Sequence, residues 1–175
     1  MTATAIARPE ATEYAPYYGT YVSKVPAGDL LQLLERQRAD TQALLAGLSD
    51  ERALHRYAPG KWSIKEVVGH IADAERIFSY RALRIARGDE TPLPGFDENA
   101  YTPAGHFDAR PLAELAAELD AVRRATIALF RGLEGDALVR RGTASNHGVS
   151  VRALAYIIAG HERHHVQILR ERYLQ

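Results

Sequence analysis

The sequence predicts an all-α protein, a four-helix bundle with up-down-down-up topology, and three observations carry this prediction. Four segments have the amphipathic period of a helix. In three of them apolar residues alternate at spacings of four and three, as in helices that pack side by side at shallow angles. The connection between the second and third helices, residues 88–110, is long enough to cross the whole bundle, so these two helices are expected to run parallel.

The chain is expected to divide into an N-terminal arm, residues 1–28, and the bundle, residues 29–175. The arm is rich in tyrosine and proline and has no helical period, which predicts an extended segment laid over the bundle. Its composition suits packing or a dimer contact better than a binding site.

The first and third helices are predicted from their end signals and their periods. Asp29 is a good N-cap for the first helix, whose inner face is expected to run from Leu30 to Leu48. Pro111 opens the third helix, because proline is well tolerated in a first helical turn. The glycines Gly132 and Gly135 interrupt the period of the third helix and mark its end.

The second helix, residues 63–87, has the clearest start. Ser63 and Glu66 have the spacing of a capping box, and Trp62 and Val67 that of a hydrophobic staple. His70 lies on the flank of the apolar face, about 80° from its centre, where a side chain can reach a neighbouring helix. A helix flank is also a common place for a solvated histidine, so both readings stay open.

The fourth helix, residues 150–173, carries a pair of histidines on its buried face. At about 100° per residue, His161 and His165 fall within one aliphatic stripe. Histidines four residues apart can direct two ring nitrogens at one ion. The alternative is a pair of core imidazoles bonded to carbonyls or to each other, which requires four satisfied ring nitrogens.

The position of His70 along its helix fits a third ligand. It lies about 10 Å from the start of the second helix, and His165 lies about 12 Å from the end of the fourth. Antiparallel packing of these helices would bring the two histidines level. The sequence therefore predicts a metal site formed by His70, His161 and His165.

The fourth helix also contains H-E-x-x-H, the zinc metalloprotease motif, from His161 to His165. A protease of this kind needs a third ligand further along the chain, and the one later acid, Glu171, points away from the pair. A narrower role remains for Glu162, as a general base on a water held by the ion or as a hydrogen-bond partner of a ligand.

Composition excludes several classes of protein. The 22 basic and 22 acidic residues cancel, and no basic stripe with interleaved aromatics suggests nucleic-acid binding. The chain has no cysteine, so disulfides and zinc–thiolate sites are excluded, and any thiol chemistry needs a small-molecule thiol. No apolar run is long enough to span a membrane, and the N-terminus does not read as a signal peptide. A cytoplasmic protein is expected.

Three stretches carry a resemblance to a known family: GKWSIKEVVGHIADAERIF, PLPGFDENAY and SVRALAYIIAGHERHHVQILRERYL. Together they resemble the DinB/YfiT-like superfamily of four-helix metalloproteins over about residues 27–175. The resemblance implies that His70, His161 and His165 hold one divalent ion, with water or substrate in the open positions. Relatives include S-transferases that use bacillithiol or glutathione and mycothiol-dependent isomerases, so a low-molecular-weight thiol cosubstrate is implied.

The expected function is that of a divalent-metal-dependent enzyme, a small-thiol-dependent S-transferase or a hydrolase, acting on a small molecule. All-histidine ligation suits zinc, nickel, iron or manganese. The alternative from another class is a non-enzymatic, stress-related dimeric binding protein in which the ion only stabilises the bundle. In either case a homodimer is compatible with the sequence. The crossover residues Phe96, Asp97, Glu98, Asn99 and Tyr101 are expected to roof the metal site.

Overall fold

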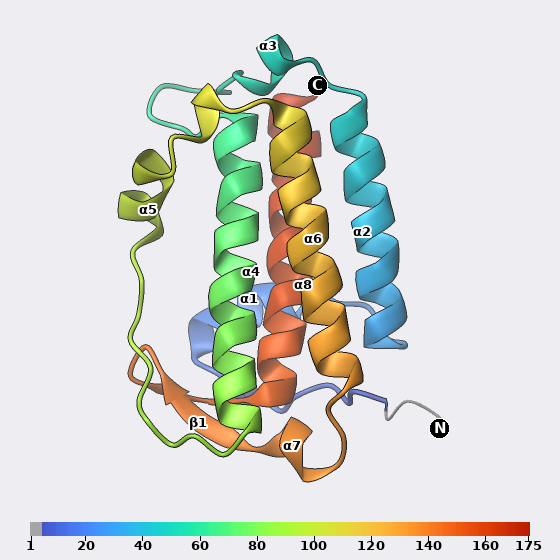
Figure 1. Cartoon of the computed structure of the whole chain (residues 1–175), viewed down its shortest axis with the longest axis vertical. Coiled ribbons are helices and arrows are strands. Elements are labelled where there is room, and N and C mark those ends of the chain that lie inside the picture. Colours follow the sequence, from blue (N-terminus) through green and yellow to red (C-terminus); the bar gives the residue numbers. More distant parts are fainter. Residues whose placement is uncertain (1–4) are drawn as a thin grey trace.

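The computed structural model describes residues 5–175, and four long helices dominate it (Figure 1). These are α2 (Leu30–Ala46), α4 (Ile64–Ala86), α6 (Leu112–Arg131) and α8 (Val151–Ile168). In Figure 1, α2 and α8 run upward whereas α4 and α6 run downward. The predicted up-down-down-up bundle is therefore confirmed.

The helices begin where their capping residues stand. The side chains of Asp29, Ser63 and Ser150 accept hydrogen bonds from backbone N–H groups in the first turns of α2, α4 and α8. Ser63 and Glu66 form both bonds of the predicted capping box. After Ile168 the last helix continues as a short π-helical segment, η4 (Leu169–Tyr173).

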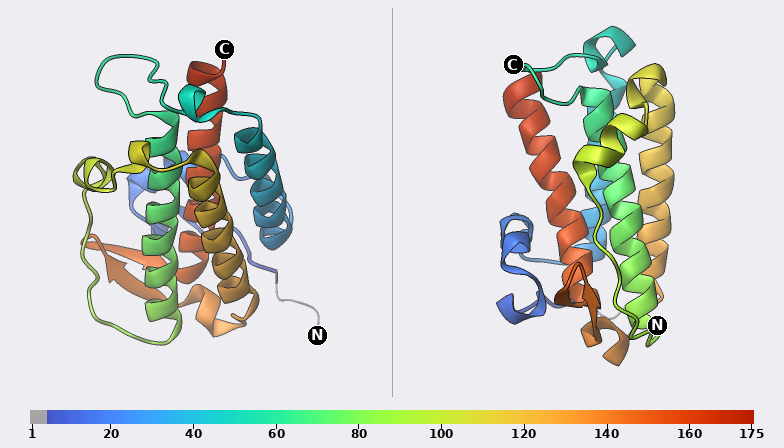
Figure 2. Two further views of the ribbon diagram at one scale, coloured as in Figure 1. Left: turned by 45° about the horizontal axis from the view of Figure 1, so that its top comes forward. Right: turned by 90° about the vertical axis from the view of Figure 1, so that its left-hand side faces the viewer.

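The connection from α4 to α6 climbs the outside of α4 and thereby allows these helices to run parallel (Figure 2, right). It contains the short helix α5 (Glu98–Ala104) and the 3-10 turn η3 (Phe107–Ala109). The Phe107 ring occupies the place of the missing side chain of Gly69, where a Cβ would lie 2.4 Å from the ring. Glycine at this position lets the crossover dock on α4 one residue before His70.

A β-hairpin that the sequence did not predict precedes α8. Strands β1 (Arg141–Ala144) and β2 (His147–Ser150) pair antiparallel, joined by Ser145 and Asn146 at φ angles of 51° and 64°. Positive φ at both central residues is typical of a tight hairpin turn. The backbone of Leu93 bonds to this hairpin, which ties the start of the crossover to it. Two further short helices are α3 (Asp50–Ala53) and α7 (Asp136–Val139).

The described part of the arm, residues 5–28, is not extended throughout. It forms two 3-10 turns, η1 (Ala11–Glu13) and η2 (Pro16–Tyr18), and one turn of α-helix, α1 (Gly19–Val22). These turns are too short to show a helical period in the sequence. For this reason the arm was expected to be extended. The segment packs along α8 on the left of the molecule in Figure 2, right.

The arm approaches α8 closely at Gly160. A Cβ at Gly160 would lie only 2.0 Å from the backbone oxygen of Tyr21, so a larger residue would displace the arm. Nearer the N-terminal end of α8, the carboxylate of Glu13 accepts hydrogen bonds from Ser150 and Arg152. The arm is thus fastened to α8 at two levels.

The buried apolar side chains form two clusters that share α4 and α8. One cluster includes Phe78 on α4 and Ile158 on α8, and the other includes Ile71 on α4 and Leu169 beyond α8. Four buried polar residues lie near the boundary between the two clusters: His70 and Glu75 on α4, and His161 and Glu162 on α8. The bundle therefore has a polar layer across its middle, where a functional site can be placed.

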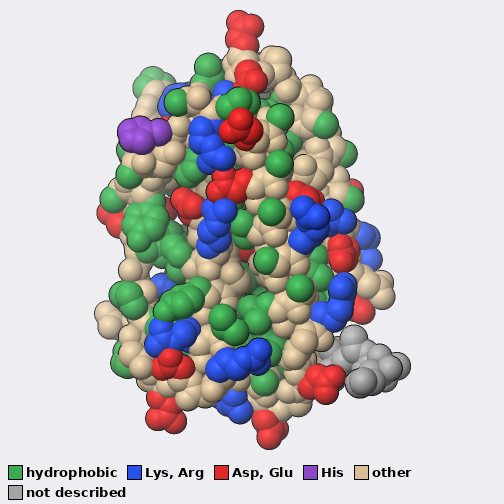
Figure 3. Space-filling model, viewed as in Figure 1, with side chains coloured by type: hydrophobic (Ala, Val, Ile, Leu, Met, Phe, Trp, Pro, Cys, Tyr) green, Lys and Arg blue, Asp and Glu red, His purple; other side chains and the backbone are tan. Residues whose placement is uncertain are grey.

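None of the helices in the described part of the chain combines the length and apolarity that a membrane span requires. On the face shown in Figure 3, acidic and basic side chains are interspersed over α4 and α6.

Candidate metal centre

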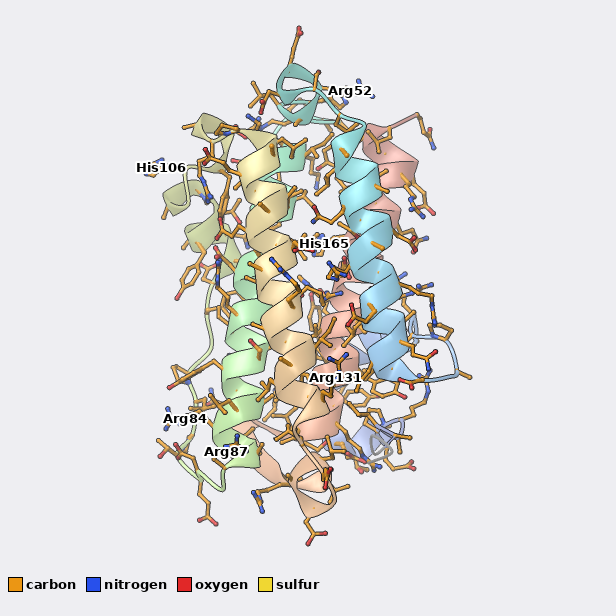
Figure 4. The ribbon with its side chains drawn as sticks, turned by 45° about the vertical axis from the view of Figure 1, so that its right-hand side comes forward. Arg52, Arg84, Arg87, His106, Arg131 and His165 are labelled. Carbon is orange, nitrogen blue, oxygen red and sulfur yellow. The ribbon has the colours of Figure 1, made fainter. Side chains whose placement is uncertain are left out.

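Three imidazoles from two antiparallel helices meet in the polar layer. The Nε2 atom of His161 lies 3.0 Å from Nε2 of His70 and 3.1 Å from Nε2 of His165. One ring nitrogen of each residue lies within 4.8 Å of the other two. Figure 4 shows the His165 side chain among the helices, in the upper half of the bundle. The structure thus brings together the three histidines that the sequence singled out.

The local sequence explains this meeting. His161 and His165 are one helical turn apart and project from the same face of α8. His70 comes two turns into α4, which runs antiparallel to α8, so its side chain reaches the same level. His70 is buried, with 7% of its surface exposed, and is not the solvated histidine of the alternative reading.

Burial keeps these imidazoles neutral. Desolvation lowers the pKa of His70 to about 4 and holds the pKa values of His161 and His165 well below the usual range. Repulsion from neighbouring rings in their charged form lowers the pKa values of His161 and His165 further. Neutral imidazoles are the form that ligates a metal ion.

The distances between the nitrogens fit a shared ion better than hydrogen bonds between the rings. An imidazole nitrogen carries either one hydrogen or one lone pair, so Nε2 of His161 can make only one good hydrogen bond. It has two close nitrogen neighbours. Tetrahedral ligands at about 2.0 Å from a zinc-like ion lie roughly 3.3 Å apart, close to the observed separations. The donor set therefore fits a divalent ion.

A cavity of about 240 Å³ opens onto the three histidines. Aromatic side chains supply most of its wall, and Glu98 supplies a carboxylate. Its lining consists of Tyr17, Tyr18, Tyr21, Trp62, His70, Phe78, Phe96, Glu98, Ser145, His161, His164 and His165. The cavity is therefore built from the arm, the crossover, the hairpin turn and the two ligand-bearing helices.

The predicted roof is only partly formed by the residues proposed from the sequence. Phe96 and Glu98 line the cavity, whereas Asn99 lines a neighbouring one near Trp62. The side chain of Asp97 caps α5, and Tyr101 is half exposed with its ring packed 5.5 Å from that of Phe96.

The arm contributes tyrosines that the sequence analysis did not assign to the site. The Tyr21 ring packs edge-on against His161, with 5.2 Å between centroids, and lies 5.4 Å from His164. Its hydroxyl is 2.9 Å from that of Tyr17. His164 is half buried against this group. No signal in the sequence places the arm here, because its docking depends on the fold around Gly160.

Glu162 is held away from the imidazoles. Its Oε1 accepts a hydrogen bond from Thr41 at 2.7 Å, and its Oε2 accepts bonds from Gln37 and Arg123 at 2.9 and 2.7 Å. The residue is 2% exposed and faces α2 and α6. With both oxygens engaged, its contacts do not support the suggested role as a general base.

Arg123 is the main buried residue that sequence reasoning missed. Its guanidinium forms a two-bonded pair with Glu75 at 2.8 and 2.7 Å, and reaches Glu162 with its remaining edge. Burial opposes the charge of Arg123, but the two carboxylates outweigh this effect and raise its pKa. The polar residues Gln37 and Thr41 on the inner face of α2 were the available sequence signal of a buried polar group.

This buried group, defined by Gln37, Thr41, Glu75, Arg123 and Glu162, is called the polar network below. It joins all four long helices and carries two carboxylates against one guanidinium. Glu75 lies five residues after His70, and Glu162 directly follows His161. The resulting negative charge favours a cation at the neighbouring neutral imidazoles.

Sequence comparisons match the chain to known proteins. The sequence profile of the DinB superfamily matches residues 33–169. A protein of Oceanobacillus iheyensis named "Putative metal-dependent hydrolase OB0413" is 27% identical over 148 residues, which cover 82% of this chain and 84% of the relative. "Putative metal-dependent hydrolase YfiT" of Bacillus subtilis is 29% identical over 91 residues, 51% of this chain and 49% of the relative.

The fold also matches a solved structure. YfiT from Bacillus subtilis, described as "a probable metal-dependent hydrolase with an unusual four-helix bundle topology", superposes with a TM-score of 0.72 at 19% identity. The match covers 94% of this chain and 92% of that chain. It supports the four-helix architecture and its helix order.

Proposed function

Because the chain belongs to the DinB superfamily, we propose that it is a divalent-metal-dependent hydrolase whose ion is held by His70, His161 and His165. The observation that carries the proposal is the convergence of three neutral Nε2 atoms on one point beside an open cavity. The names of the relatives from Oceanobacillus iheyensis and Bacillus subtilis support the same reaction class.

Three protein ligands leave at least one position of an ion open, as in catalytic and not structural sites. When bound, the ion would supply Lewis acidity for polarising a scissile bond and for activating water at neutral pH. Among the described residues, 5–175, Glu98 is the carboxylate that lines the cavity, and we assign it the role of proton acceptor. It stands on the crossover, at the start of α5, and lines the same cavity as the three histidines.

The cavity wall points to the substrate class. Trp62, Phe78, Phe96 and the arm tyrosines present apolar ring surfaces around a small polar centre. Such a wall binds an apolar or aromatic group and excludes water from the reacting bond. We propose a small ester or amide with an aromatic group next to the bond that is cleaved.

Zinc, nickel, iron and manganese all accept histidine ligands, and the identity of the ion stays a prediction. A small-thiol-dependent S-transfer is the second candidate. The chain has no cysteine, so in this reaction a thiolate could reach the ion only from a cosubstrate, and this composition is compatible with either candidate. The proposed homodimer stays a prediction that sedimentation analysis would test.

Elemental analysis by plasma mass spectrometry tests the metal centre, with wild type beside His165→Ala. The expected result is about one divalent ion per chain in wild type and its loss in the variant. The exposed residue His147 gives a matched control, since His147→Ala should keep the ion. Wild type without an ion, even after incubation with zinc, nickel and manganese, would overturn the proposal.

Activity assays with the loaded protein then separate the candidate functions. Aromatic esters and amides should be hydrolysed at a rate that falls with chelation and in His165→Ala. Turnover only when a small thiol and an electrophile are both present would favour S-transfer instead. Unfolding on chelation without any activity in the loaded protein would indicate a structural ion.

A further inference from the structure

A second and larger cavity, of about 520 Å³, opens between α2 and α8. Its α8 wall includes Glu162 and Val166, which follow His161 and His165 by one residue and so lie about 100° around the helix from the ligand face. This cavity therefore faces away from the three imidazoles. Its volume is in the range of small-molecule sites.

Gln37 lines this cavity and has an unused hydrogen-bonding group. Its Nε2 donates to the backbone oxygen of Ala159 at 3.0 Å and to Glu162 at 2.9 Å, which fixes the orientation of the amide. The residue is 7% exposed, and its Oε1 is buried without a hydrogen-bond partner among the described residues. Buried acceptors normally have a donor, and a ligand N–H or O–H group that reached this oxygen from the cavity would supply one.

The rim of the cavity carries both signs of charge on opposite helices. Asp40 stands on α2, whereas Arg163 stands on α8 and Arg170 just beyond it. Within residues 5–175 none of these three side chains forms an ion pair. Nε of Arg163 donates to the backbone oxygen of Lys24, which holds the guanidinium at the rim.

The other charged side chains of the rim already make hydrogen bonds to neighbouring side chains. Nζ of Lys24 donates to Gln167 at 2.9 Å, and Gln167 in turn donates to Glu171 at 2.7 Å. Both oxygens of Glu162 accept hydrogen bonds within the polar network, from Thr41, Gln37 and Arg123. The charged side chains of the rim that make no bond to another side chain of the described residues are thus Asp40 on the α2 side and Arg163 and Arg170 on the α8 side.

We propose that this cavity binds a small zwitterion, a free amino acid. Its ammonium group would lie on the α2 side, where Asp40 offers charge and Gln37 Oε1 offers an acceptor. Its carboxylate would lie on the α8 side with Arg163 and Arg170, since guanidinium groups bind carboxylates with two parallel hydrogen bonds. A simple anion would be repelled by Asp40, and a simple cation by the arginines.

Isothermal titration calorimetry tests the proposal with five probes: L-alanine, L-leucine, L-glutamine, L-glutamate and L-arginine. At least one should bind with one site per chain. Propionate and ethylamine match L-alanine but lack the ammonium or the carboxylate group, and both should bind more weakly than the amino acids. No binding by any of the five amino acids, or equal binding by propionate, would overturn the proposal.

Variants at exposed positions locate the site without threatening the fold. Asp40→Asn and Arg170→Gln should each weaken amino-acid binding by about tenfold or more. Arg172→Gln is the matched control, because Arg172 is an exposed arginine of the same segment outside the cavity lining. His165→Ala should leave the affinity unchanged. Binding that is lost in His165→Ala but kept in Asp40→Asn would assign the ligand to the histidine cavity and overturn the proposal.

Discussion

The guanidinium of Arg123 lies 2.7 Å from the carboxylate of Glu162, the residue that directly follows His161. The same guanidinium holds Glu75, five residues after His70, so one side chain of α6 is bonded to both helices that carry the imidazoles. Such a connection restrains the rotation and height of α4 relative to α8. The polar network thus positions the histidines without touching them.

Replacement of Arg123 by methionine should destabilise the protein strongly. It would leave two buried carboxylates without their cation, and breaking a buried ion pair in this way costs roughly 3 to 5 kcal/mol. Chemical denaturation measures the loss. Arg124→Met is the matched control, because Arg124 is exposed on the same helix, and its effect should stay within about 1 kcal/mol. Equal effects of the two variants would contradict the role of Arg123.

Replacement of Glu162 by glutamine should affect metal affinity more than the pH profile of the reaction. Glu162 bonds Arg123 and the α2 side chains, so its loss of charge loosens the helix that carries His161. We expect weaker metal binding, by about tenfold, and an unchanged pH profile of kcat in the loaded enzyme.

The proton acceptor proposed above, Glu98, should behave in the opposite way. Glu98→Gln should keep the metal content and lower kcat by about a hundredfold or more. Parallel measurement of metal content and of kcat against pH separates the two roles. A full metal content with a hundredfold loss of kcat in Glu162→Gln would restore Glu162 as the general base.

Replacement of Gly160 by alanine should detach the arm from α8. The added Cβ would meet the backbone of Tyr21, which cannot move aside as a flexible side chain could. A cost of about 1 to 3 kcal/mol is expected for such overpacking. Limited proteolysis should cleave within the arm faster than in wild type. Gly148→Ala is the control, since a Cβ there meets nothing within 4 Å, and it should be cleaved at the wild-type rate.

Low pH should weaken the attachment of the arm to the start of α8, which Glu13 makes with Ser150 and Arg152. Hydrogen bonds from Arg152 and Ser150 lower the pKa of Glu13 to about 2 against an ordinary value of 4.5, although burial acts in the opposite direction. Because the folded pKa is depressed, this contribution to stability is complete above pH 4.5 and is lost as the pH falls toward 2.

The Glu13→Gln variant isolates this contribution. It should be less stable than wild type by roughly 2 kcal/mol at pH 7, and the difference should shrink below pH 4. Thermal unfolding across this pH range measures it. A difference that stays constant from pH 7 to pH 2 would show that the carboxylate charge of Glu13 does not hold the arm.

Much of the fold could be predicted because its signals are local. The caps Asp29, Ser63 and Ser150 and the spacing of apolar residues lie within single helices, and the structure follows them closely. The metal centre could be anticipated for a related reason. His161 and His165 are one turn apart, and the depth of His70 in its helix can be counted once antiparallel packing is assumed.

The features that escaped prediction depend on contacts between distant segments. The hairpin strands are four residues long, too short to show a clear alternation, and the turns of the arm are shorter still. Gln37 and Thr41 on an otherwise apolar face were an available signal of a buried polar layer, from which no prediction was made. Their partner Arg123 could not be identified, since its place depends on how α6 rotates against α4 and α8.

The sequence alone determined that four long helices form, where they begin, in what order they run, and that three histidines would share one level. Helix capping and amphipathic period act within a few residues, so they can be read from the chain. Only the tertiary structure decided what surrounds those histidines: the tyrosines of the arm, Glu98 of the crossover, and the Glu162 carboxylate bound to Arg123. These placements follow from side-chain packing between segments far apart in the chain, and no local pattern encodes them.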